Sequence, residues 1–214
     1  SELFAKEDTG KYILEMPDST AKDFCYPIGK LYDSSTTLVE HVRHKCVRGL
    51  FIDIFPIDGI GETMKQARQN YKSVKWLYYI YMTRTVSISG KRSMGKNVLT
   101  AMSRIVPDAV LPERWLRMKL DRSCAKYDFD SSKYVGNLLG NKYEGEIVPK
   151  DYFGNPREVD FEGHKLFMHQ EPEKYLTHIF GNWSAMPPKE KQVTHHDFKA
   201  KIGRAVQQEC RDRS

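Results

Sequence analysis

The chain has 214 residues, which fits one full domain, or one domain with a subdomain, and is long enough to bury a core without disulfide bonds or a structural metal. Hydrophobic residues make up 40% and charged residues 29%, a balance that excludes collagen-like, low-complexity and wholly disordered classes. The formal charge of +6 suits anionic partners such as nucleotides, phosphorylated glycans, nucleic acids or a membrane surface, without choosing among them. Four widely spaced cysteines without a C-x-x-C pair favour a reducing compartment.

The first section, residues 10–60, is predicted to contain strands and loops. Short apolar runs at residues 12–14 and 26–32 precede the sharpest local signal, residues 49–56. There, apolar and β-branched residues between a glycine and a proline predict a buried strand. Residues 40–45, just before it, predict a short turn or a helix end.

The second section, residues 61–127, is predicted to be helical. Apolar residues from Met64 to Met82 fall at steps of three and four, which places them on one helix face. Pro112 and Glu113 then open another helix, because proline is tolerated in the first turn and an acid is favoured beside the helix dipole. The inner face of that helix is expected to consist of Leu116, Leu120, Cys124 and Tyr127.

The third section, residues 128–198, is predicted to return to short strands and turns. Residues 134–139 and 161–167 have the composition of strands. Residues 172–180 predict a helix that begins at a proline and ends before a glycine.

Asp53 is the strongest candidate for chemistry from the residues alone. In a strand it points away from its apolar neighbours Ile52 and Ile54, and a buried carboxylate needs a metal, a cation or several hydrogen-bond donors. Asp58, beyond Pro56, is expected in the loop that leaves this strand, and acids there are natural Mg²⁺ ligands in phosphoryl transfer. The alternative is a structural aspartate that caps a turn or pairs with an arginine.

Two further patterns are weak. Residues 90–96 fit the phosphate-loop pattern G-x-x-x-x-G-K, but Asn97 stands where a serine or threonine would hold Mg²⁺, so an exposed basic loop is the preferred interpretation. Residues 41–46, with the pattern H-x-x-H-x-C, contain ligand-type side chains. They lack a second cluster to close a tetrahedral zinc site, unless the histidines at 195–196 do so in space.

Several segments together resemble the LicD family of phosphocholine transferases. Residues 30–40, KLYDSSTTLVE, resemble the family's K-hydrophobic-x-D-x-x-T-T-x-V-E segment, and residues 49–59, GLFIDIFPIDG, are similar to its G-x-F-I-D-I-F-P-L-D-G block. Residues 161–163 and 173–176 resemble its F-E-G and Y-L elements. Residues 181–196 are similar to its closing G-D-[WY]-x-x-x-P-P…H-H signature, with asparagine in place of the common aspartate. These elements occur in family order over most of the chain.

The resemblance implies an α+β fold with a nucleotidyltransferase-like mixed sheet and a helical insertion. It also implies a phosphotransferase that moves phosphocholine, or a related phospho-alcohol, from a CDP-activated donor to a hydroxyl of a cell-surface glycan: teichoic acid, capsule or lipopolysaccharide. Related members of the fukutin type transfer ribitol phosphate from CDP-ribitol. The implied cofactor is Mg²⁺ or Mn²⁺, and the implied partners are CDP-choline or a similar CDP-alcohol and the sugar acceptor, with no nucleic acid. The expected location is cytoplasmic, including the inner face of the membrane through peripheral association.

The resemblance also suggests roles for individual residues. Asp53 matches a family carboxylate that holds the metal beside a D-x-D pair on the neighbouring strand, which favours a catalytic, metal-binding aspartate over a structural one. Asp58 is kept as a second metal ligand. The predicted donor-binding residues are Lys30, Thr36 and Thr37, and acceptor deprotonation is assigned to His195 or His196.

One element of the family is missing. The D-D-D-x-D segment that supplies the first two metal carboxylates normally precedes the Lys30 segment, and nothing from Ser1 to Asp23 matches it. The expectation is therefore an incomplete domain over residues 1–198 with a basic tail over residues 199–214, or a member without the usual active site. The alternative function is a non-catalytic relic of the same fold that acts as a binding or scaffolding domain. A nucleic-acid-binding module, suggested only by the charge, ranks last.

Overall fold

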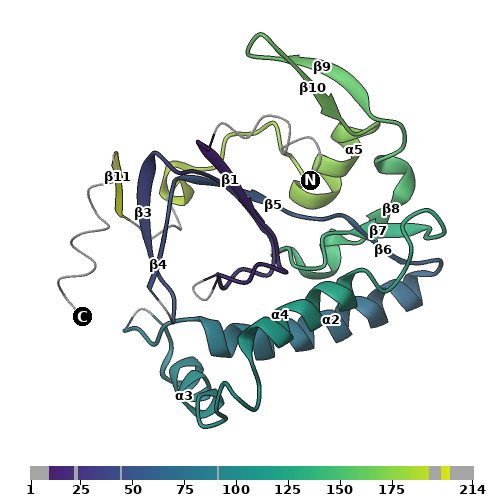
Figure 1. Ribbon diagram of the computed structural model, residues 1–214. Coiled ribbons are helices and arrows are strands. Elements are labelled where there is room, and N and C mark those ends of the chain that lie inside the picture. The colour runs from purple at the N-terminus through teal and green to yellow at the C-terminus, as the bar shows by residue number, and fades with distance from the viewer. Residues whose placement is uncertain (1–9, 22–23, 44, 91, 193–198, 203–214) are drawn as a thin grey trace. The chain divides into compact units, whose positions relative to one another are not determined.

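The chain forms two compact units (Figure 1). The computed structural model describes residues 10–21, 24–43, 45–90, 92–192 and 199–202. Unit 1 comprises residues 1–55, 77–121 and 195–214, and unit 2 comprises residues 56–76 and 122–194. Each unit is therefore assembled from separate stretches of the sequence.

Unit 1 contains an antiparallel sheet with the strand order β1-β2-β5. Its strands are β1 (Tyr12–Glu15), β2 (Gly29–Asp33) and β5 (Phe51–Ile54). β2 lies in the centre, and its register with β5 places Lys30 opposite Asp53. β2 and β5, which are separated in the sequence by the strands β3 and β4, are thereby brought into direct contact.

A second antiparallel sheet of unit 1 has the order β11-β3-β4. β3 (Thr36–His41) and β4 (Lys45–Arg48) form a hairpin, and β11 (Lys199–Ile202) pairs with the other edge of β3. The register places Ile202 opposite Thr36. Residues 199–202, at the start of the predicted basic tail, thus contribute a strand to this sheet.

The helical section consists of α2 (Met64–Thr85), α3 (Met94–Ser103) and α4 (Glu113–Cys124). Both α2 and α4 run from one unit into the other, because the boundaries after residues 76 and 121 fall inside them. The positions predicted from helical spacing are buried: Ala67, Tyr71, Val74 and Tyr81 in α2, and Leu116, Leu120 and Cys124 in α4. In the described part of the chain, every helix lacks the length or the apolar character needed to cross a bilayer.

Unit 2 contains an antiparallel sheet with the order β6-β7-β8. Its strands are β6 (Asp58–Gly61), β7 (Tyr134–Gly136) and β8 (Val148–Pro149). Each strand contributes one fully buried side chain to the core, namely Ile60, Val135 and Val148. Short 3-10 helices lie in the same unit: η1 (Tyr143–Glu146), η2 (Lys150–Tyr152) and η3 (Lys189–Lys191).

The remaining elements of unit 2 are a hairpin and a helix. β9 (Arg157–Phe161) and β10 (His164–Met168) are joined by Glu162 and Gly163, with φ angles of 49° and 81°. Two successive positive φ angles are typical of a tight hairpin turn whose twist matches its strands. α5 (Pro172–Phe180) begins at proline and ends before a glycine, as predicted from the sequence.

The structure confirms the mixed α+β class and the main helices, and it corrects several local predictions. The strand near Asp53 is placed correctly but is not buried, since Ile52, on the face opposite Asp53, is 68% exposed. Residues 161–167 are not one strand, since the chain turns inside them. Tyr127 lies beyond the end of α4 and forms a β-bridge with Gly59 instead.

Two further predictions concern loops. Residues 40–45 were predicted as a short turn or a helix end; they join β3 to β4 in a hairpin, so the turn is confirmed and the helix end is wrong. The phosphate-loop pattern at residues 90–96 follows helix α2, and α3 begins within it at Met94. A phosphate loop follows a strand, so this segment lacks the required arrangement.

Candidate functional site

The candidate site is centred on Lys30 and Asp53, which are opposite each other on β2 and β5. The ammonium Nζ of Lys30 lies 3.0 Å from the carboxylate Oδ1 of Asp53. Lys30 is only 4% exposed, whereas the Asp53 side chain keeps 31% of its surface accessible. The cation is thus held inside unit 1 while its partner reaches the solvent.

Two aromatic rings surround the same ammonium group. Nζ of Lys30 lies 3.1 Å from the ring centroid of Phe51 and 4.0 Å from that of Tyr26. Phe51 is two residues before Asp53 on β5, so both side chains belong to the same face of the strand. Cation–π contact and a carboxylate together offset the cost of removing an ammonium from water. Asp53 was correctly expected to need a partner, and that partner is a lysine.

The predicted metal site is not assembled by the residues that the structure describes. Among them, no three His, Cys, Asp or Glu side chains come together to hold a metal ion. Asp58 begins β6 in unit 2, paired with Gly136 across the strands. Asp53 already faces a buried cation, and a metal beside it would meet like charge. The described residues therefore show no ready-made cluster for a magnesium or manganese ion, and the metal site stays a prediction.

Thr36 has a role inside the fold. Its hydroxyl Oγ1 donates to the carbonyl of Asp33 at 2.8 Å and accepts a hydrogen bond from the N–H of Leu50 at 2.7 Å. These bonds connect the turn before β3 to the turn before β5. The two turns cross so closely that a Cβ at Gly49 would lie 1.8 Å from the Asp33 carbonyl oxygen.

The other predicted site residues have different outcomes. Thr37 is buried on β3, at 5% exposure. His195 and His196 lie outside the described residues, as does His44 of the zinc pattern. The assignment of these residues to donor or acceptor binding stays a prediction.

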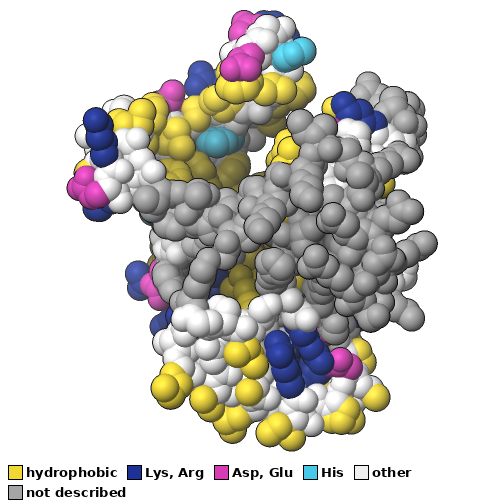
Figure 2. Space-filling view, turned by 90° about the vertical axis from the view of Figure 1, so that its left-hand side faces the viewer, with side chains coloured by type: hydrophobic (Ala, Val, Ile, Leu, Met, Phe, Trp, Pro, Cys, Tyr) yellow, Lys and Arg dark blue, Asp and Glu magenta, His cyan; other side chains and the backbone are white. Residues whose placement is uncertain are grey.

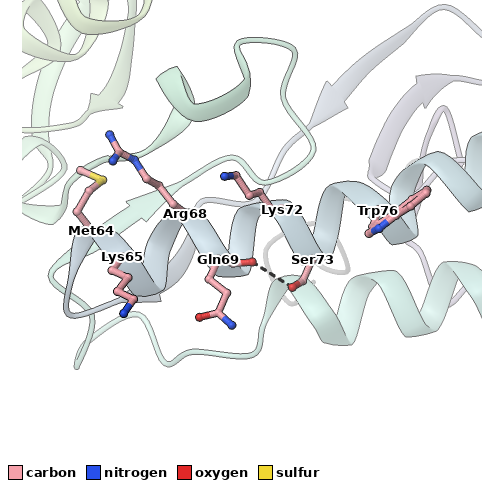
Figure 3. Close-up of a pocket in the computed structure, with 7 residues that line it drawn as sticks. All are labelled: Met64, Lys65, Arg68, Gln69, Lys72, Ser73 and Trp76. Atoms are coloured by element: carbon pink, nitrogen blue, oxygen red, sulfur yellow. Dashed lines mark hydrogen bonds between the residues drawn. The ribbon is translucent and has the colours of Figure 1, made fainter.

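A surface that the sequence reasoning missed lies along α2 in unit 2. An open hollow of about 720 Å³ is lined by Met64, Lys65, Arg68, Gln69, Lys72, Ser73 and Trp76 (Figure 3). Figure 3 shows Arg68 and Lys72 extending to one side of the helix and Lys65 to the other. Glu144 approaches two of the cations, at 3.1 Å from Arg68 and 3.9 Å from Lys72.

Trp76 distinguishes this surface from an ordinary solvated helix face. It is 72% exposed, although tryptophan usually buries most of its ring. Arg68, Lys72 and Trp76 recur at steps of four, so they form one row on the helix. A tryptophan in the charged row of an amphipathic helix is the sequence signal that could have revealed this surface.

A partly buried histidine, His169, lies among aromatic rings elsewhere in unit 2. The ring of His169 is 5.2 Å from that of Phe153 and 5.0 Å from that of Tyr175, measured between centroids. Burial is the main cause that lowers the pKa of His169 below its usual value. The neutral imidazole is therefore the form that this aromatic cluster stabilises.

Comparison with known proteins tests the relationship with the LicD family that the motifs suggest. The chain is 24% identical over 210 residues to the lipopolysaccharide cholinephosphotransferase LicD of Haemophilus influenzae, and the match covers 94% of this chain and 74% of LicD. This chain is related to LicD. The predicted relationship with the LicD family is thereby confirmed. No family model and no solved structure match the chain.

Proposed function

We propose that this chain transfers phosphocholine, or a related phospho-alcohol, from a CDP-activated donor to a hydroxyl of a cell-surface glycan. The observation that carries the proposal is the similarity to LicD over 94% of the chain, since LicD is named as a cholinephosphotransferase of lipopolysaccharide. The mixed α+β architecture is compatible with a nucleotidyltransferase-like fold. Lys30 and Asp53, from the two segments that most resemble the family, lie in direct contact.

The proposed reaction is an in-line phosphoryl-type transfer. The acceptor oxygen forms a bond to the phosphorus of phosphocholine, and the bond from that phosphorus to the bridging oxygen breaks, so that CMP leaves with the electron pair. The acceptor hydroxyl gives its proton to a base, the role predicted for His195 or His196. Catalysis of this kind depends mainly on positioning and on charge stabilisation. A divalent cation, Mg²⁺ or Mn²⁺, belongs to the proposal as a requirement to be tested.

Asp53 is proposed as the positioning group on the donor side. Its carboxylate is partly open, and the contact with buried Lys30 fixes its orientation. An oriented carboxylate can accept a hydrogen bond from a hydroxyl of the donor or of the acceptor. Phe51 and Tyr26 keep the lysine, and through it the carboxylate, in place.

The α2 surface is proposed as the place where an anionic acceptor glycan binds. Lys65, Arg68 and Lys72 offer positive charge to phosphate groups, and the exposed ring of Trp76 offers a flat apolar surface to a sugar. This combination suits a phosphorylated saccharide better than a neutral one.

A second candidate function is donor or glycan binding without turnover. The observation that favours it is the pairing of Asp53 with a lysine, together with the lack of a metal-binding cluster among the described residues. A relic of the fold would keep the binding surfaces and lose the reaction.

The test is an assay with CDP-choline, lipopolysaccharide and either Mg²⁺ or Mn²⁺, with CMP release and choline incorporation measured together. A matched control for Asp53→Asn is Asp160→Asn, because Asp160 is an exposed aspartate of β9 that also contacts a lysine, at 2.9 Å. We expect transfer by the wild type and the control, loss in Asp53→Asn, and loss when EDTA is added. Calorimetric binding of CDP-choline without CMP release would support the second candidate. Neither binding nor release would contradict both.

A further inference from the structure

Helix α3 has its polar side turned toward the protein. Thr100 is fully buried and its hydroxyl donates to the carbonyl of Lys96 at 2.8 Å. The amide of Asn97 donates to the carbonyl of Ser89 at 2.8 Å, and the hydroxyl of Ser103 donates to the carbonyl of Thr83 at 2.9 Å. Asn97, Thr100 and Ser103 are spaced by three, so they form one row that attaches the helix to unit 1.

The outward side of α3 is apolar. The exposed fractions are 82% for Met94, 52% for Val98, 57% for Leu99, 59% for Met102 and 77% for Ile105 just after the helix. Hydrophobic side chains line the lower edge of the face in Figure 2, at the height where Figure 1 places α3. This arrangement is the reverse of an ordinary surface helix, which buries its apolar face and exposes its polar one.

An exposed apolar face of this kind marks a contact surface. The charged residues beside it indicate the kind of partner. Residues 92–107 contain no aspartate or glutamate. Arg92 and Arg104 donate to the carbonyls of Ser87 and Val86 inside unit 1, whereas Lys96 is exposed. An exposed lysine beside an apolar helix face, in a segment without acids, can bind anionic lipid headgroups while aliphatic side chains enter the acyl region. The ten-residue length of α3 suits a helix that lies in the membrane surface.

We propose that α3 docks unit 1 on an anionic lipid bilayer. Met94, Leu99 and Ile105 insert below the headgroups, and Lys96 contacts lipid phosphates. The proposed ligand of α3 is an anionic bilayer surface rather than a single soluble phosphate. The inference goes beyond the proposed transfer reaction and does not depend on it.

The experiment is co-sedimentation of the full chain with vesicles of phosphatidylglycerol and phosphatidylcholine, compared with phosphatidylcholine alone. The test variant combines Met94→Gln, Leu99→Gln and Ile105→Gln. The control combines Phe167→Gln and Met186→Gln, which are 79% and 81% exposed in unit 2. We expect the partition coefficient to fall at least about 100-fold in the test variant. The control variant should bind like the wild type.

The charge is tested separately with Lys96→Gln. We expect about a fivefold loss on anionic vesicles, since one lysine near such a surface contributes about that factor. On phosphatidylcholine alone the variant and the wild type should be equal. Circular dichroism melting checks the fold, and if the triple variant melts early, Met94→Gln and Ile105→Gln are measured singly.

Three results would overturn the proposal. The first is that the wild type does not sediment with anionic vesicles, and the second is that the triple variant binds the vesicles as tightly as the wild type. The third is self-association of the wild type in ultracentrifugation, abolished in the triple variant and without vesicle binding, which would assign the face to a second copy of the chain.

Discussion

Lys30 and Asp53 form an asymmetric ion pair: their charged atoms are 3.0 Å apart, yet the lysine is buried and the aspartate is partly exposed. The rings of Tyr26 and Phe51 lie over the ammonium of Lys30 on the central strand β2. The side chain of Asp53, on the edge strand β5, keeps 31% of its surface accessible. The two halves of the pair should therefore respond differently to substitution.

The first prediction concerns this pair. Asp53→Asn leaves a buried ammonium without its counter-charge, which we expect to cost about 2–4 kcal/mol in the free energy of unfolding. Lys30→Met leaves a carboxylate that can still reach water, at a cost of about 1–2 kcal/mol. Urea denaturation of both single variants and the double variant gives the coupling energy. Strictly additive effects would show that the two groups do not interact.

The second prediction concerns the crossing of the turns at Gly49. Gly49→Ala places a Cβ 1.8 Å from a backbone oxygen, so the backbone must shift, and we expect a loss of about 3 kcal/mol. Gly95→Ala is the control, because nothing lies within 4 Å of a Cβ there and alanine is the better helix former. Thermal unfolding of both variants is the measurement. Equal melting temperatures would contradict the close approach.

The third prediction separates structure from substrate binding at Thr36. Thr36→Val removes both hydrogen bonds of its hydroxyl and should lower stability by about 1–3 kcal/mol. Thr36→Ser keeps the hydroxyl and should restore most of that loss. If Thr36 acts only in the fold, the KM for CDP-choline should be the same in Thr36→Val and the wild type at a temperature where both are fully folded. A raised KM in folded Thr36→Val, restored in Thr36→Ser, would instead support the predicted donor contact.

The fourth prediction is a pH dependence from His169. Because burial lowers its pKa in the folded state, the unfolded chain binds the proton more readily below a pH of about 6.5. Stability should therefore be complete above that pH and fall as the pH decreases toward the folded pKa. Urea unfolding across this range should show a shallower slope in His169→Phe than in the wild type. An identical slope would contradict the assignment.

The fifth prediction tests the α2 surface. Trp76→Ala should raise the KM for a phosphorylated glycan acceptor about tenfold, without changing the KM for CDP-choline. Arg68→Ala and Lys72→Ala should weaken acceptor binding in a salt-dependent way. Lys174→Ala, at another surface lysine that pairs with a glutamate, is the control. Loss of donor binding in Trp76→Ala would place the surface at the other substrate.

Helices α2, α4 and α5 were predictable from the sequence because their signals are local, whereas α3 was not predicted. The spacing in α2, the proline before α4 and the proline and glycine around α5 each act within a few residues. Tyr127 shows the limit of this reasoning. It continues the apolar spacing of α4, but its backbone pairs with Gly59 of β6, which lies far from Tyr127 in the sequence.

The candidate site was predictable only in part, for the same physical reason. Lys30 and Asp53 were each chosen by residue type and resemblance, but their pairing depends on the register of two strands that are not adjacent in the sequence. Local patterns do not specify which strands meet. The exposure of Ile52 depends on whether another element covers its face of the sheet, which is again a property of the assembled fold.

The pairing of β11 with β3 has a consequence for synthesis on the ribosome. β3 and β4 emerge early, whereas the strand that covers the outer edge of β3 begins at Lys199. Until then the nascent chain carries an open β edge, and such edges pair with other chains. Termination before Lys199 would leave that edge uncovered permanently, so shortened chains should aggregate even when all of their helices can form.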